Sequence, residues 1–591
     1  MKKVFITEEF ERKNQPLSVL DGALRAMASL QGEPSKHKTL VIALDGISFD
    51  KVRHMAGEGR LPTFKRLTEC GVSTKMRSTI PPDSLPAWPS FITGKNPAKH
   101  GMLGYFKFNK ETGENIVVNA TMISEPKYWN IFSEFGFNSV VMNLPLTFPP
   151  EKINGIMISD YLTPQGKIFC YPEELCEKLR QVGYFTELAM TKFFDYDLTR
   201  PEPYLYKMEK TKDVAISIMK NYNWDMFTLG FMSMDKAHHM LGLECEGIDM
   251  LYKKVDSILA EILGTVDLLH TDIFIVSDHG TVNYGKEFSL HSWLYQKGLL
   301  KLNALGEQLK AVSIEGSRRQ KYKRNYWNMG WLKIMGFLYR LKVSLNLPRI
   351  PFFHFPRQVI EENAINPCPF DWTKTKVYSL MPPTSNYLPI FINTKGERPF
   401  GTVEAGEEYQ QLKIFLKNEL EGLCDPETGK KIVERIYEKE ELYSGPFLAE
   451  MPDIVARLRQ DYIGFTGYSN RGRIIKGPIF KKFNKPVLNH SIESIFIFCG
   501  PNSRHNTEVQ DMDIIDVFPN ILYSRNLPIP EDVDGKVRRD IFKEEFCANV
   551  QPKFRKPTIK EPEARKSWLK KHSQTDLELI ESELKRLGYI K

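Results

Sequence analysis

The stretch TLVIALDG, residues 39–46, decides the fold class of this chain. Its first six residues form an apolar run with the length of a strand buried on both faces, and the run ends in Asp45 and Gly46. Similar apolar runs recur at residues 139–144 (SVVMNL), 226–232 (MFTLGFM), 273–276 (IFIV) and 494–498 (SIFIF). Because helical patterns alternate with these runs, the sequence predicts an α/β fold with a doubly wound, mostly parallel sheet.

Chemically active residues stand beside several of these predicted strands. They are Asp45 after the first run, Asp235 and His239 after the third, Asp278 and His279 after the fourth, and His490 just before the last. In open parallel sheets ligands bind beyond the carboxyl ends of the strands, so we expect these side chains to gather at one edge.

A second stretch, TIPPDSLPAWPSFITGKNPAKHG (residues 79–101), contains the candidate nucleophile Ser84. Pro82 and Pro86 bracket this serine and favour a helix that starts just after it. A serine in this position is commonly only an N-cap. It becomes a nucleophile if a metal or a base supports its hydroxyl at the positive helix end.

The candidate ligands suit a metal site. Asp235 and His239 are four residues apart, so on a helix they share one face and can hold one cation; His238, at a spacing of three, is the rival ligand. Taken singly, an Asp-Gly pair is commonly a turn, and a lone histidine is commonly structural. Their joint placement with Ser84 favours metal binding, with zinc as the first choice and manganese as the second.

Composition indicates a soluble globular protein. The 591 residues are 42% hydrophobic and 12% aromatic, and they are too many for one ordinary core. The N-terminus lacks the apolar run of a signal peptide, and no segment approaches the ~20 apolar residues of a membrane span. The eight cysteines form no C-x-x-C pair, which predicts reduced, mostly buried thiols in a cytoplasmic protein.

The net charge of +8 is concentrated in one segment. Between Gly306 and Pro356 stand ten basic residues and two acidic ones, interleaved with aromatic residues such as Tyr326 and Trp327. A helical cap packed on the core, with its charges in water, explains this pattern. An anionic membrane surface bound through residues 316–350 also explains it, and would make the cytoplasmic protein peripheral at the membrane. No recognisable nucleic-acid module accompanies the charges.

These patterns divide the chain into five predicted parts. They are an N-terminal extension (1–37), the first part of the catalytic α/β core (38–305), the basic, aromatic helical cap insertion (306–365), the second part of the core (366–545), and a basic linker with a C-terminal helix (546–591).

The order of these motifs resembles one family. Asp45-Gly, P-x-S-x-P-A-W around Ser84, T-G-K-x-P-x-K-H-G at residues 93–101, Asp235-x-x-x-His239, Ser277-Asp-His-Gly280 and His490 are similar to the type I phosphodiesterase and nucleotide pyrophosphatase branch of the alkaline phosphatase superfamily. The resemblance covers residues 38–535 and implies a three-layer α/β/α core.

The resemblance also implies the site. One metal would be held by Asp45, Asp278, His279 and the Ser84 oxygen, and the other by Asp235, His239 and His490. Asn119 would donate to a non-bridging phosphate oxygen; a solvent-exposed turn asparagine is the alternative. The expected enzyme is a hydrolase that forms a phosphoserine intermediate on a phosphate-ester or nucleotide-like substrate.

Departures from the family pattern bear on the substrate. Many relatives have threonine where Ser84 stands, and either hydroxyl can attack. No arginine closely follows Ser84, which favours diesters, although Arg77 upstream or a distant arginine could grip a dianionic monoester. The absence of a nearby Pro-x-Arg sets sulfatases aside. Phosphomonoester hydrolysis, phosphotransfer to an alcohol, and a membrane-surface or polyanion-binding protein with a vestigial core remain the alternatives.

Overall fold

The computed structural model describes most of the chain outside its two ends and one long internal segment. The described residues are 14–108, 115–163, 167–186, 199–242, 245–303, 370–379, 381, 384–398, 400–465, 478–510 and 512–557. The predicted cap (306–365), its candidate membrane surface (316–350) and the predicted C-terminal helix therefore lie outside the described residues. Among the described helices, none combines the length and apolar character needed to cross a membrane.

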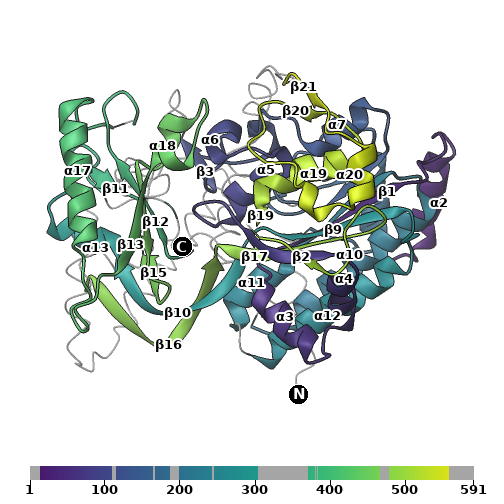
Figure 1. Ribbon diagram of the computed structural model, residues 1–591, viewed down its shortest axis with the longest axis horizontal. Coiled ribbons are helices and arrows are strands. Elements are labelled where there is room, and N and C mark those ends of the chain that lie inside the picture. Colours follow the sequence, from purple (N-terminus) through teal and green to yellow (C-terminus); the bar gives the residue numbers. More distant parts are fainter. Residues whose placement is uncertain are drawn as a thin grey trace, which may run out of the picture.

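A ten-stranded, mostly parallel sheet forms the centre of the larger part of the molecule (Figure 1). Its strands, in spatial order, are β18 (Thr507–Glu508), β2 (Val72–Arg77), β17 (Glu493–Cys499), β9 (Thr271–Ser277), β1 (Lys38–Leu44), β8 (Met226–Phe231), β5 (Ser139–Met142), β6 (Gly155–Ile158) and β7 (Cys170–Tyr171), with β19 (Met512–Asp513) also paired to β2. The strands from β9 to β6 are parallel to one another, as the sequence predicts. In contrast, β17, which contains the predicted strand 494–498, is antiparallel to both of its neighbours.

Helices cover both faces of this sheet, and the alternating side chains of strand β1 contact both helical layers. Leu40, Ile42 and Leu44 face one hydrophobic cluster, whereas Val41 and Ala43 face another, because successive side chains of a strand point to opposite faces. The first face is covered by α2 (Ser18–Ala28), α3 (Phe49–Gly57), α4 (Pro62–Cys70), α8 (Glu174–Gln181), α10 (Glu202–Asn221), α11 (Ser233–Leu241) and α12 (Glu246–Leu263). The second face is covered by α5 (Ser84–Thr93), α7 (Tyr128–Glu134), α19 (Val517–Ser524) and α20 (Glu544–Asn549). The three-layer α/β/α core is confirmed.

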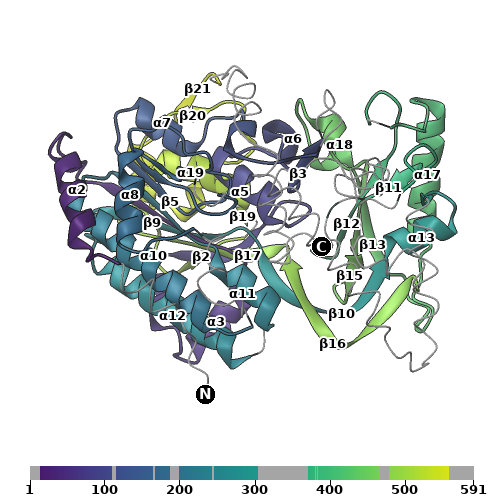
Figure 2. The ribbon, with the colours of Figure 1, turned by 180° about the vertical axis from the view of Figure 1, so that it is seen from behind.

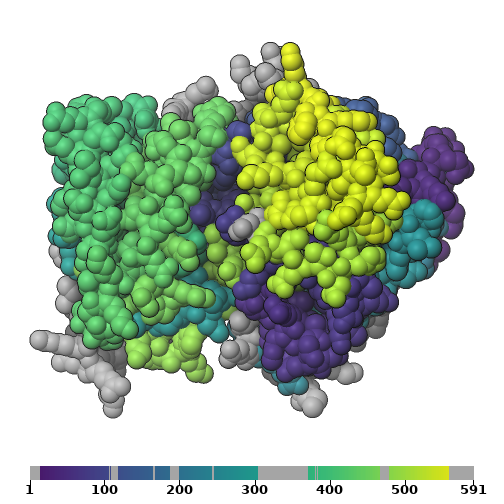
Figure 3. Space-filling model, in the orientation of Figure 1, coloured from purple at the N-terminus to yellow at the C-terminus, as the bar shows by residue number. Residues whose placement is uncertain are grey.

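The described part of residues 280–490 forms a small lobe beside this large lobe (Figures 1 and 2). It contains one three-stranded sheet of β15 (Tyr462–Phe465), β10 (Gly280–Ser289) and β16 (Phe480–Ser491), and one four-stranded antiparallel sheet of β11 (Val377–Tyr378), β12 (Tyr387–Ile392), β14 (Ile454–Leu458) and β13 (Val433–Glu438). Its described helices include α13 (Leu290–Gln296), α17 (Glu407–Glu421) and α18 (Lys439–Leu442). The lobe has its own hydrophobic cluster, which the sequence patterns do not distinguish from the core of the large lobe. In Figure 3 its green surface lies beside the yellow and purple surface of the large lobe.

The prediction of reduced, mostly buried cysteines is wrong for several residues. Cys170 and Cys176 form a disulfide, because the tight return from β7 to α8 brings their Cα atoms to 5.6 Å. Cys70 and Cys424 are exposed, and Cys547 is the buried free cysteine among the described residues.

Candidate active site

Ser84 is the first residue of helix α5, not the residue before it. The N-cap is Asp83, whose backbone is extended. Its carboxylate accepts a hydrogen bond from the Leu85 N–H at 3.2 Å, so Asp83 has the capping role that we expected for the serine. Ser84 is therefore not needed for capping. Its buried hydroxyl lies at the positive end of a ten-residue helix, where an anion is stabilised.

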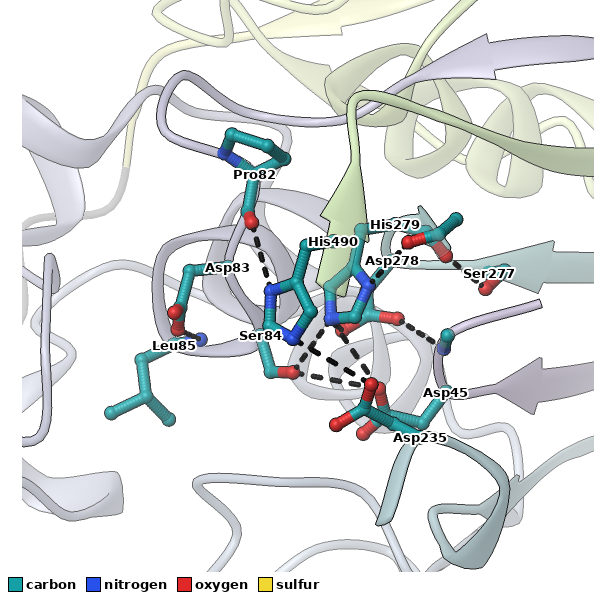
Figure 4. Close-up of polar contacts among 12 residues, drawn as sticks. Asp45, Pro82, Asp83, Ser84, Leu85, Asp235, Ser277, Asp278, His279 and His490 are labelled. Carbon is teal, nitrogen blue, oxygen red and sulfur yellow. Dashed lines mark hydrogen bonds and ion pairs between the residues drawn. The ribbon is translucent and has the colours of Figure 1, made fainter. Parts of the chain in front are cut away.

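The Ser84 hydroxyl contacts residues from two neighbouring strands. Its Oγ lies 3.4 Å from Asp45 Oδ1 and 3.2 Å from His279 Nε2. Asp45 follows β1, and His279 follows β9; these strands pair in parallel, with Leu44 opposite Ser277. The register of the sheet thus brings both side chains to the serine, as Figure 4 shows.

Asp45, Asp278 and His279 form the first candidate metal group. Each offers a ligand atom within 4.8 Å of the others, and all three side chains are buried. The Gly46 N–H donates to Asp278 Oδ1 at 3.2 Å, and His279 Nδ1 lies 3.1 Å from the Gly280 carbonyl, which directs Nε2 toward the group. Burial and the Asp278 and Asp235 carboxylates raise the pKa of Asp45 well above its usual value. Such crowding of buried acids favours a bound cation.

The second group is built around Asp235 on α11. Asp235 Oδ2 lies 3.3 Å from His239 Nε2, and its Oδ1 lies 3.6 Å from His490 Nε2. Asp235, His490 and His279 also offer ligand atoms within 4.8 Å of one another. His490 Nδ1 lies 3.1 Å from the Pro82 carbonyl, so its Nε2 is directed inward (Figure 4). Burial opposes ionisation of Asp235, but the charges of His239 and His490 outweigh this effect and lower the pKa of its carboxyl.

The placement of His490 differs from the sequence prediction. We expected it just before the last strand of the parallel sheet, whereas it lies within a strand of its own, β16, opposite Thr281 of the antiparallel partner β10. The His279 and His490 rings stack with centroids 3.7 Å apart, so the two candidate metal groups lie directly beside each other.

His238, the rival ligand, does not join either group. Its ring centroid lies 5.7 Å from that of Tyr252 on α12, and burial lowers its pKa to about 3. The helical spacing of four residues is therefore the one that brings a histidine to Asp235.

Asn119 is a buried capping residue. Its Oδ1 accepts hydrogen bonds from the Thr121 N–H at 2.9 Å and the Thr121 hydroxyl at 2.7 Å, and it caps the short helix η1 (Ala120–Met122). Its Nδ2 is buried with no hydrogen-bond partner in the described part of the chain. The side chain is thus not solvent-exposed, and no hydrogen bond among the described residues joins it to Ser84.

The motif at residues 93–101 is structural. His100 Nε2 lies 2.9 Å from the Ser90 hydroxyl, and its Nδ1 accepts from the Met102 N–H, while burial lowers its pKa to about 3. Lys95 is buried and pairs with Glu125 and Asp532. These contacts connect α5 to its surroundings.

The residues of the two groups fit divalent cations. Both carboxylate oxygens of Asp235 and Oδ2 of Asp278 are buried and accept no well-formed hydrogen bond from the described residues, although histidine nitrogens lie 3.3 to 3.6 Å from them. Buried acceptors without donors are costly, and a cation satisfies them. Mixed carboxylate and imidazole ligands suit zinc or manganese.

A buried serine hydroxyl between two Asp/His groups at the edge of an α/β sheet is an arrangement suited to metal-assisted phosphoryl transfer. Residues 39–330 match the family model of the type I phosphodiesterases and nucleotide pyrophosphatases. This match places residues 39–330 in that family, as the motifs predict, and the protein is a hydrolase that acts on phosphoric ester bonds.

Two solved structures illustrate the likeness. Murine ectonucleotide pyrophosphatase/phosphodiesterase 5, an inactive variant in complex with AMP, is 13% identical, with a TM-score of 0.48, covering 86% of this chain and 100% of its own. Phosphonoacetate hydrolase from Sinorhizobium meliloti 1021, in complex with phosphonoacetate, is 14% identical, with a TM-score of 0.46, covering 83% of this chain and 95% of its own.

Proposed function

We propose that this phosphoester hydrolase is a two-metal phosphodiesterase in which Ser84 is the nucleophile. The observation that carries the proposal is the position of the Ser84 hydroxyl, 3.4 Å from Asp45 and 3.2 Å from His279 at the start of α5. A hydroxyl in such a place reacts as an alkoxide when its charge is stabilised.

The two cations, for which we propose zinc, have separate ligand sets. The first set is Asp45, Asp278, His279 and the Ser84 oxygen; the second is Asp235, His239 and His490. When bound, two such cations supply the positive charge that favours the alkoxide and stabilises the leaving oxygen of an in-line displacement.

The chain's own residues account for the remaining steps. Ser84 Oγ attacks phosphorus, a bond forms between them, and the bond between phosphorus and the leaving oxygen breaks to release an alcohol. The N-terminus of α5 favours the negative charge that develops at this place. Water then cleaves the serine ester, which releases the phosphate product and restores the hydroxyl. Asn119 Nδ2, buried and without a described partner, is proposed as a donor to a non-bridging oxygen.

We propose diesters, including nucleotide-like ones, as the preferred substrates. Arg77, the residue considered for gripping a dianionic monoester, instead binds Asp513 through two hydrogen bonds of 2.8 and 3.0 Å. A bidentate pair of this kind holds the guanidinium in place. The monoanionic phosphate of a diester requires no such additional cation.

The test is hydrolysis of an aryl phosphodiester and an aryl phosphomonoester by the purified protein. We expect faster cleavage of the diester, and loss of activity on chelation and in Ser84→Ala. Ser90→Ala is the matched control, because it removes a buried hydroxyl of the same helix that contacts His100. Activity that survives both chelation and Ser84→Ala would overturn the mechanism. Product analysis with added alcohols separates hydrolysis from phosphotransfer.

A cytoplasmic location is part of the proposal. The Cys170–Cys176 disulfide opposes it, because disulfides persist mainly in oxidising compartments. Fractionation of cells that make the full chain, with thiol labelling of these two cysteines, tests the location. Labelled thiols in the cytoplasmic fraction support the proposal, and an exported protein contradicts it.

A further inference from the structure

The chain passes between the two lobes on strands that begin or end at proposed ligands. It leaves the large lobe on β10, directly after Asp278 and His279, and it returns on β16, which contains His490 near its end. The two strands are antiparallel partners, with Thr281 opposite His490 (Figure 1). The proposed metal site therefore lies where the lobes join.

The backbone of His490 is held by the small lobe. Its N–H donates to the Thr384 carbonyl at 2.7 Å, and its carbonyl accepts from the Tyr284 hydroxyl at 2.7 Å. The same hydroxyl accepts from the Asn386 N–H at 3.3 Å. Tyr284 is 1% exposed, so solvent does not compete for these bonds.

The segment 384–386 is in turn fixed within the small lobe. Asn386 Nδ2 donates to the Leu458 carbonyl at 2.8 Å, and the Leu458 N–H donates back to the Asn386 carbonyl at 2.8 Å. The Gly464 N–H donates to the Ser385 carbonyl at 3.1 Å. Strands β14 and β15 thus set the position of the residues that hold His490.

The small lobe also contacts the region that leads to Ser84. The Tyr443 hydroxyl donates to the Ile80 carbonyl at 2.5 Å, and the Phe447 N–H donates to the Ala98 carbonyl at 2.9 Å. Closer to the candidate site, His490 Nδ1 contacts the Pro82 carbonyl, two residues before Ser84. One set of hydrogen bonds therefore joins the lobe, His490 and the serine loop.

We propose that Tyr284 is a positioning residue through which the small lobe sets the geometry of the second metal group. The proposal rests on the metal-dependent function proposed above. Among the described residues, no hydrogen bond or ion pair joins the Tyr284 side chain to a candidate ligand atom or to the serine hydroxyl. Tyr284 instead fixes the backbone that directs His490 Nε2 toward Asp235. Outer partners that orient a ligand in this way contribute strongly to metal affinity.

The experiment measures zinc binding to the metal-stripped full chain by calorimetry, together with the visible spectrum of the cobalt-loaded protein. We expect the natural protein to bind two cations. In Tyr284→Phe, one cation binds as before, and the other binds about 10- to 100-fold more weakly, with a changed cobalt spectrum. Tyr462→Phe is the control, because Tyr462 lies on β15 of the same three-stranded sheet as Tyr284, but its hydroxyl pairs with Asp425 and not with His490.

Two unchanged affinities and an unchanged spectrum in folded Tyr284→Phe would overturn the proposal. If that variant does not fold, Asn386→Ala replaces it, because it removes the side-chain hydrogen bond that helps to hold the segment 384–386 on Leu458 but keeps Tyr284 and His490. It should weaken the same cation selectively, and equal affinities would again overturn the proposal. A natural protein that binds no cation would instead contradict the proposed function itself.

Discussion

The two lobes contribute to the candidate site in different ways. The large lobe supplies Ser84 and every proposed ligand except His490, and it does so from the ends of strands β1 and β9 and from helices α5 and α11. The small lobe supplies the strand that contains His490, and holds that residue through Thr384 and Tyr284. The proposed nucleophile and most of the proposed ligands therefore lie in the large lobe, whereas the small lobe holds the remaining ligand, His490, in place.

The strongest test of this division concerns the nucleophile in the large lobe. Ser84→Ala should lower kcat/KM for an aryl phosphodiester by at least about 10⁴-fold, because a lost nucleophile removes the covalent route. Ser84→Thr should keep most of the activity, since either hydroxyl can attack. Steady-state kinetics of the two variants measures the contrast, and equal losses in both would contradict the assigned role.

Removal of a buried charge in the small lobe should change the stability of the fold more than it changes metal binding by the first group. Asp453 is fully buried and binds Lys439 at 3.0 Å, the Tyr409 hydroxyl at 2.9 Å and the Ile392 N–H at 2.7 Å. Asp453→Ala leaves Lys439 without this partner and should lower the free energy of unfolding by about 3–5 kcal/mol. Urea denaturation of the protein measures this effect.

An exposed pair of the same lobe provides the control. Lys395 and Glu404 are half exposed, so Glu404→Ala should change the free energy of unfolding by less than about 1 kcal/mol. If Asp453→Ala were as mild as this control, the buried network would not be what stabilises the lobe.

Variants of the two adjacent histidines of α11 test which of them is a metal ligand of the large lobe. His239→Ala should weaken binding of one cation by more than about 10²-fold, a larger loss than that of an outer partner. His238→Ala should leave the metal content unchanged, because its ring packs beside Tyr252. Metal analysis after dialysis distinguishes the two, and the reverse order of losses would show that the ligand was assigned to the wrong histidine.

The smallest expected effect is a pH-dependent contribution of Glu438 in the small lobe. Hydrogen bonds from Lys413 and Lys417 lower the pKa of Glu438 to about 2 from its usual 4.5. The carboxylate therefore stabilises the fold above pH 4.5, and this contribution is lost as the pH falls through about 2. Glu438→Gln should cost about 1 kcal/mol or less at neutral pH, because the group is partly exposed.

Unfolding measured over a pH series checks this expectation. The difference between the natural protein and Glu438→Gln should shrink toward zero in acid. A difference that stays constant with pH would mean that the charge of Glu438 contributes nothing to stability.

The sequence predicted the parallel core well, because its strands are short apolar runs that end in polar residues. Asp45 and Asp278 could be found because the carboxyl ends of β1 and β9 meet at one edge. The position of Ser84 was one residue off, since an aspartate before a serine offers a second cap that the pattern does not distinguish.

The small lobe could not be derived in the same way. Tyr284 and Thr384 act through a hydroxyl and a backbone carbonyl, and no residue type marks such a role. The antiparallel pairing that places His490 joins positions far apart in the chain, so it depends on the register of β10 and β16. The Cys170–Cys176 disulfide likewise follows from a turn whose shape the cysteine spacing did not reveal.

The most direct test of the central claim is mass spectrometry of the protein quenched in acid during turnover of a phosphodiester. The account predicts a peptide in which Ser84 bears the phosphoryl group of the substrate, formed only when a divalent cation is present and absent in Ser84→Ala. If product accumulates while Ser84 remains unmodified at every time sampled, and the adduct forms on another residue or on none, the claim that Ser84 is the nucleophile is contradicted.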